Sequence, residues 1–168
     1  MSKAKYPNKP IPRKIFQDGI DLCKRNIRDF LTDAQLIIAQ GRLNHAYIMV
    51  EFAIEELGKI VMLKEAFSSD LNDPVTVEGD VFGTHKGKSE KAWTVLDINC
   101  RTIFDEGLFD HELFDPDLFD TDTLASHKTR LNCAFVDFKG DCWTLGERIK
   151  QELLEKLINH INEAIRKI

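Results

Sequence analysis

The sequence predicts an all-α protein, an up-and-down four-helix bundle, and two observations carry that prediction. First, apolar residues recur at helical spacing in four long stretches, Arg13–Gln40, Arg42–Glu65, Asp80–Phe104 and Leu145–Ile168. Second, turn residues separate these stretches, with Gly41 after the first and an Asp/Asn/Pro-rich run after the second. Four amphipathic helices bury their apolar faces best around one shared core.

Length and composition predict one soluble domain. The chain has 168 residues, of which 43% are hydrophobic and 30% charged. We expect a single helical bundle domain over residues 13–168, preceded by an N-terminal arm over residues 1–12. The net charge of -5 argues against a general electrostatic grip on nucleic acid. The four cysteines lack zinc-ligand spacing, and no apolar run is long enough for a membrane span. These features predict a cytoplasmic protein with no cofactor, metal or membrane partner.

The second stretch carries an unusual polar stripe. Glu51, Glu55 and Lys59 recur every four residues between apolar neighbours. The ordinary interpretation is an ion pair between Glu55 and Lys59. Charges flanked by apolar residues are costly to desolvate unless they pair, so we expect another helix to contribute partners.

A second polar cluster, His85 and Lys88, lies in the sequence GTHKGK at the start of the third stretch. Packed beside the second helix, this end could bring His85 and Lys88 to the glutamates. A carboxylate beside an imidazole orients the ring, which is a general acid/base arrangement. The alternative is a structural role, in which His85 only bonds a buried glutamate.

The segment Phe104–Leu124 is acidic and rich in phenylalanine. Its phenylalanines recur every five residues, each followed by aspartate, which neither a helix nor a strand aligns on one face. The ligand order of a calcium-binding loop is missing. We interpret residues 104–144 as an irregular insert, whose phenylalanines cover the bundle, and an extended segment. If the protein is a binding module, the rings of Phe104–Leu124 are instead exposed and form its binding surface. Leu131–Trp143 predicts a short hairpin before the last helix.

Three motifs, in order, resemble the AbiV-type abortive infection proteins. AYIMVEFAIEELGKIVML resembles their EELGK helix, FGTHKGK their F..H..K element, and RLNCAFVDF with Trp143 their R…YVD…W segment. These proteins are grouped with the HEPN superfamily of small helical bundles, many of which are metal-independent endoribonucleases or toxins acting as dimers. The resemblance implies a homodimer in antiphage defence. The candidate residues are His85, Lys88, Glu55 and Lys59 for catalysis, and Glu51, Glu56, Arg130 and Asp137 for a binding or structural cluster.

Two functions follow from these features. The first is a defence protein that binds a phage or host protein and blocks growth or translation. The second is a metal-independent endoribonuclease that uses His85 and Lys88 with Glu55 and Lys59 on RNA. The superfamily's nuclease members have an arginine followed four to six residues later by histidine, which this chain lacks, and Phe135 replaces a tyrosine. This departure favours binding. A helical bundle of unrelated function is the third alternative.

Overall fold

A computed structural model describes residues 8–69, 71–77, 79, 83–96, 136–139, 142–145 and 149–168. The predicted insert Phe104–Leu124 and the candidate Arg130 lie outside these residues. Of Lys86 and of the two strands in residues 136–145, only the backbone is described. Within the described ranges the structure has four α-helices and two short two-stranded ribbons, which confirms the all-α fold.

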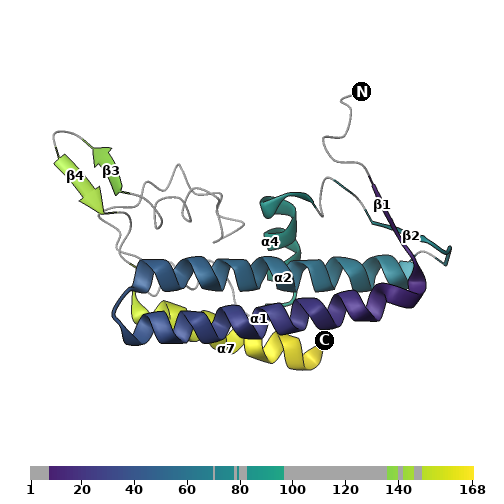
Figure 1. Cartoon of the computed structure of the whole chain (residues 1–168), viewed down its shortest axis with the longest axis horizontal. Helices are drawn as coiled ribbons and strands as arrows, with labels where there is room; N and C mark the ends of the chain where they lie inside the picture. The colour runs from purple at the N-terminus through teal and green to yellow at the C-terminus, as the bar shows by residue number, and fades with distance from the viewer. Residues whose placement is uncertain are drawn as a thin grey trace.

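Two long helices, α1 (Phe16–Ala39) and α2 (Leu43–Ser69), form an antiparallel pair. A 3₁₀ turn, η1 (Arg13–Ile15), precedes α1. Gly41 adopts φ 70° and ends α1, while Arg42 N–H donates to the Ile37 carbonyl at 3.2 Å and Gly41 N–H to the Ile38 carbonyl at 2.8 Å. This is the Schellman arrangement, in which the left-handed residue is most easily glycine. It turns the chain back sharply, so that α2 lies against α1 (Figure 1).

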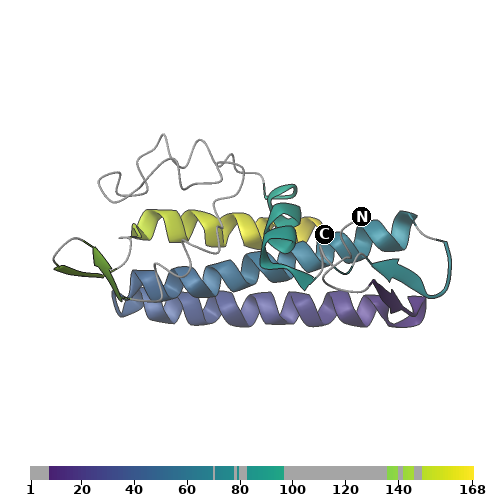
Figure 2. The same ribbon diagram turned by 90° about the horizontal axis from the view of Figure 1, so that it is seen from above.

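The last helix, α7 (Gln151–Lys167), packs on the other side of α2. Figure 2 shows α2 lying between α1 and α7. One stripe of α7 is buried: Leu153, Leu154, Leu157, Ile158, Ile161, Ala164 and Ile165. The helix was predicted from about Leu145, but Leu145 belongs to a strand and α7 begins only at Gln151. Because α2 has neighbours on several sides, it is apolar around most of its circumference.

Within the predicted helix Asp80–Phe104 the structure has α4 (His85–Trp93), which stands across α2 in both views (Figures 1 and 2). Residues 80–82 and 97–104 of that prediction lie outside the described residues. Thr84 is its N-cap, and the Thr84 hydroxyl accepts a hydrogen bond from the Gly87 N–H at 3.1 Å. After Trp93 the backbone continues as a turn over residues 94–96. Between Trp93 and Leu96 the apolar spacing therefore does not mark continued helix, because Leu96 is buried from a turn.

The N-terminal segment is docked where the structure describes it. Strand β1 (Lys9–Ile11) pairs antiparallel with β2 (Val75–Val77), with Pro10 opposite Thr76. Arg13 fastens the entry to α1: its side chain donates to the Phe67 carbonyl at 3.0 Å and lies 4.0 Å from the centre of the Phe67 ring. Strand β2 was not predicted, because the turn residues around it indicate a loop that connects two helices.

The predicted hairpin is present as β3 (Val136–Lys139) and β4 (Cys142–Leu145), paired with Phe138 opposite Trp143. It lies near the end of the molecule where α1 passes into α2 (Figure 1). The β1–β2 ribbon lies near the opposite end. In the part of the chain that the structure describes, no helix has the length and apolarity that crossing a bilayer requires.

Candidate functional site

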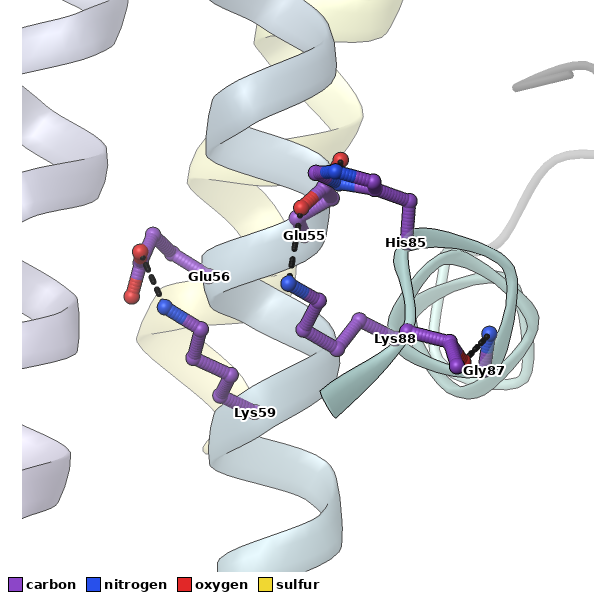
Figure 3. Close-up of polar contacts among 7 residues, drawn as sticks. Glu55, Glu56, Lys59, His85, Gly87 and Lys88 are labelled. Carbon is purple, nitrogen blue, oxygen red and sulfur yellow. Dashed lines mark hydrogen bonds and ion pairs between the residues drawn. The ribbon is translucent and has the colours of Figure 1, made fainter. Parts of the chain in front are cut away.

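Two side chains of α4 contact the carboxylate of Glu55 on α2. Its Oε1 lies 2.6 Å from Nδ1 of His85, and its Oε2 lies 3.0 Å from Nζ of Lys88 (Figure 3). Both partners come from the first turns of α4. One carboxylate therefore joins two helices through two charge-assisted contacts.

The local sequence explains this convergence. The Thr84 cap starts the helix immediately before His85, so that His85 and Lys88, three residues apart, project from the same face of α4. Glu55 lies in the middle of α2, where its neighbours Ala53, Ile54 and Leu57 are fully buried. The imidazole and the ammonium thus reach the same carboxylate from one side, as Figure 3 shows.

The Glu55 carboxylate is held in its charged form. Burial raises the pKa of Glu55, but the hydrogen bond and positive charge of Lys88, and then those of His85, outweigh burial and hold the pKa below its usual value. The residue is only 6% exposed. A buried negative charge of this kind is stable only with its partners in place.

The two partners differ in their access to solvent. The Lys88 side chain is 11% exposed, so its ammonium is mostly enclosed and is neutralised by Glu55. The His85 side chain is 53% exposed. His85 is therefore the member of the cluster that a partner or substrate can touch, while Glu55 and Lys88 lie behind it.

Lys59 does not join this cluster. The predicted ion pair between Glu55 and Lys59 is wrong: Nζ of Lys59 lies 2.6 Å from Oε1 of Glu56 instead. Glu56 is one position along the helix from Glu55, a rotation of about 100°, and so points to another side of α2. In Figure 3 the Glu56–Lys59 pair lies on the side facing α1, and Glu55 on the side facing α4.

Cys23 of α1 meets the Glu56–Lys59 pair. Burial, followed by the negative charge of Glu56 and a hydrogen bond to it, raises the pKa of the Cys23 thiol to about 12, and Lys59 opposes this only in part. The thiol therefore stays protonated at neutral pH. Such a thiol is a poor nucleophile, so Cys23 is not a catalytic candidate.

Two further candidates can be placed, and one cannot. Glu51 lies one helical turn before Glu55 and is 3% exposed, so the polar stripe on α2 is largely buried. Asp137 lies on β3, where its backbone pairs with Thr144. Arg130 falls outside the described residues.

Gly58 is a structural residue of this site that the sequence interpretation missed. A Cβ atom added to Gly58 would lie 1.8 Å from the carbonyl oxygen of Lys88, so the α4 backbone rests directly on α2 at this glycine. The available signal was a glycine in the interior of a long apolar helix, where it costs about 1 kcal/mol relative to alanine. That cost suggests a packing reason, which the structure supplies.

A cleft of about 270 Å³ lies between α2, β2 and α4. Its lining includes Glu65 and Lys91, whose carboxylate and ammonium are 2.5 Å apart, and Ser69, Thr76 and Val77. Among the described residues, no three histidine, cysteine, aspartate or glutamate side chains gather closely enough to hold a metal ion.

The comparison with protein families gives a match that covers most of the chain. The family model described as HEPN_AbiV, AbiV, matches residues 16–166, from the first residue of α1 to the last turn of α7. No curated protein and no solved structure matches the chain. Because the match spans all four described helices and the α2–α4 junction, the chain belongs to the AbiV family of HEPN proteins.

Proposed function

We propose that this protein is an antiphage defence protein of the abortive-infection type, which binds a phage or host component and thereby blocks growth or translation. Membership of the AbiV family supports the defence role. The observation that carries the binding mechanism is the burial of Lys88 against Glu55. The ammonium that would stabilise the charge on a phosphate in a nuclease is here already neutralised and enclosed.

In this proposal the Glu55–Lys88 pair is structural. It links α4 to α2, and α4 presents His85 and its exposed neighbours, such as Glu90, to the partner. A helix held at fixed points is a rigid binding element, which reduces the entropy lost on association.

Plaque assays test the defence role. Cells that express the protein should yield fewer phage plaques than cells with an empty vector, and infected cells should stop growing before phage is released. Equal plaque numbers across a panel of unrelated phages would contradict the proposal. Purified protein added to a cell-free translation reaction, with and without infected-cell extract, separates a block of translation from other targets.

The second candidate function is a metal-independent endoribonuclease, and one observation favours it. The Glu55 carboxylate, held charged, lies 2.6 Å from Nδ1 of His85, while the imidazole is half exposed. A carboxylate that orients an accessible imidazole is the arrangement of a general acid/base. Here His85 would move the proton of the ribose hydroxyl or of the leaving group, and no metal would be needed.

An RNA cleavage assay in EDTA decides between the two candidates. The nuclease predicts cleavage by the wild-type protein and its loss in His85→Ala, with His45→Ala as the control because His45 is an exposed histidine in the first turn of α2. The binding mechanism predicts no cleavage by any of the three proteins. Cleavage that His85→Ala leaves at the wild-type rate would remove His85 as the catalytic group.

We also propose that the protein works in the cytoplasm as a homodimer, as its superfamily suggests. Sedimentation equilibrium over a range of protein concentrations tests the oligomeric state. A mass equal to one chain, 19.3 kDa, at all concentrations would contradict the dimer.

A further inference from the structure

The closest approach between α2 and α4 is a backbone contact at Gly58. A methyl group in place of the Gly58 hydrogen would lie 1.8 Å from the carbonyl oxygen of Lys88, 2.6 Å from its carbonyl carbon and 3.0 Å from its Cα. These are backbone atoms, which cannot rotate away as a side chain can. Any side chain at position 58 therefore has to push α4 off α2.

The contact and the ion pair engage the same residue of α4. Lys88 places its carbonyl on Gly58 and its ammonium on Glu55, three residues earlier on α2. His85, one helical turn before Lys88, is then brought to the other oxygen of the same carboxylate. The position of the Lys88 backbone therefore determines where the imidazole lies.

The backbone contact constrains α4 more tightly than the ion pair does. A lysine side chain has four rotatable bonds and can follow a carboxylate through several positions of the helix. A buried ion pair adds little net stability once desolvation is counted. At nine residues, α4 is also too short to be a stable helix by itself, so its structure depends on the surface beneath it.

We propose that Gly58 is a positioning residue for the function of this protein: its missing side chain fixes α4 on α2 and thereby fixes His85 at the site. This inference rests on the proposed function in one respect: it assumes that His85 or the exposed face of α4 contacts the partner or the substrate. The steric part stands on the geometry of α2 and α4 alone.

Gly58→Ala tests the proposal, with Gly19→Ala as a matched control. Both glycines lie inside long helices, but a Cβ atom at Gly19 would meet only the Leu63 side chain, at an ordinary 3.7 Å. Gly19→Ala should therefore leave the structure unchanged. A third variant, Glu55→Gln/Lys88→Met, removes both charges of the ion pair, so that neither stays buried alone, and keeps the backbone contact at Gly58.

Amide hydrogen exchange of α4 is the first measurement. Exchange at residues 89–93 should be at least about tenfold faster in Gly58→Ala and unchanged in Gly19→Ala, because opening of α4 is a local event. In Glu55→Gln/Lys88→Met it should stay within about threefold of wild type. Wild-type exchange in Gly58→Ala would overturn the proposal, and so would a tenfold acceleration in Glu55→Gln/Lys88→Met. Should Gly58→Ala fail to fold, as judged by circular dichroism, the Glu55→Gln/Lys88→Met result decides.

The second measurement separates a shift in the position of α4 from a change in the stability of the whole protein. In Gly58→Ala the Glu55 carboxylate loses Lys88 and His85, so its pKa, followed by carboxyl carbon NMR, should rise from its lowered value. In Gly19→Ala it should not change. Plaque protection should then be lost in Gly58→Ala and kept in Gly19→Ala. Protection that persists although α4 is released refutes the functional role of Gly58, whereas a wild type without protection refutes the proposed function itself.

Discussion

Nζ of Lys88 lies 3.0 Å from Oε2 of Glu55, and the two side chains are only 11% and 8% exposed. The chain thus places an ion pair from two different helices inside the protein. Such pairs add little net stability, but loss of one partner is expensive, because the remaining charge stays buried. Because of this asymmetry, mutations of Glu55 and Lys88 can test whether the two side chains interact across the junction of α2 and α4.

Glu55→Gln should destabilise the protein by about 3 kcal/mol, because it leaves the Lys88 ammonium enclosed without a counter-charge. Adding Lys88→Met to the same chain should recover more than half of that loss. Urea unfolding, followed by circular dichroism, measures both values. A double variant that is less stable than Glu55→Gln would show that the pair does not interact as the distance implies.

The contribution of the charged Glu55 carboxylate to the free energy of unfolding should decrease as the pH falls. The pKa of Glu55 is lower in the folded chain than its usual 4.5, since Lys88 and His85 outweigh burial. Its contribution is therefore present above pH 4.5 and is lost as the pH falls through the folded-state value. The difference in unfolding free energy between wild type and Glu55→Gln should shrink below that pH. A difference that stays constant down to the acid transition would contradict this.

Cys23 should resist alkylation in the folded protein. With its pKa raised to about 12 by burial and Glu56, little thiolate exists at pH ~8. Labelling of Cys23 by iodoacetamide, read by peptide mass spectrometry, should be at least about 100-fold slower in the native chain than in urea. Glu56→Gln should accelerate it, because the nearby negative charge and the hydrogen bond are removed. Equal rates in native and unfolded protein would show that the thiol is not held in this way.

The two polar clusters on α2 should act independently. Lys59 pairs with Glu56 toward α1, and Lys88 pairs with Glu55 toward α4. The destabilisations caused by Lys59→Met and Lys88→Met should therefore add within about 0.5 kcal/mol in the double variant. A coupling energy above about 1 kcal/mol would mean that the four side chains form one network.

The sequence predicted the helices well because their signal is local. Apolar spacing located α1, α2 and α7, and Gly41 marked the turn between the first two. Strand β2 was missed because it is only three residues long and depends on β1, which is about 65 residues away in the sequence. The end of α4 was missed because buried apolar residues such as Leu96 continue the helical spacing through a turn.

The sequence predicted which kinds of charged side chain form the candidate site, but not which cation pairs with which carboxylate. The buried stripe on α2 required partners, and GTHKGK offered an imidazole and an ammonium at the right spacing. Which cation joins which carboxylate depends on where α4 crosses α2, and that position is set by Gly58. Spacing along one helix favoured a pair between Glu55 and Lys59, whereas the neighbouring helix supplies Glu55 with its partners and leaves Lys59 to Glu56.

The role of the α2–α4 contact is tested most directly by the efficiency of phage plating on cells that express wild type, His85→Ala or His45→Ala at equal protein levels. Both histidines are exposed, so neither substitution should unfold the chain, but only His85 is held by Glu55 at the α2–α4 junction. We expect His85→Ala to lose protection and His45→Ala to keep it. Full protection by His85→Ala would contradict the claim that the junction is the working centre of this protein.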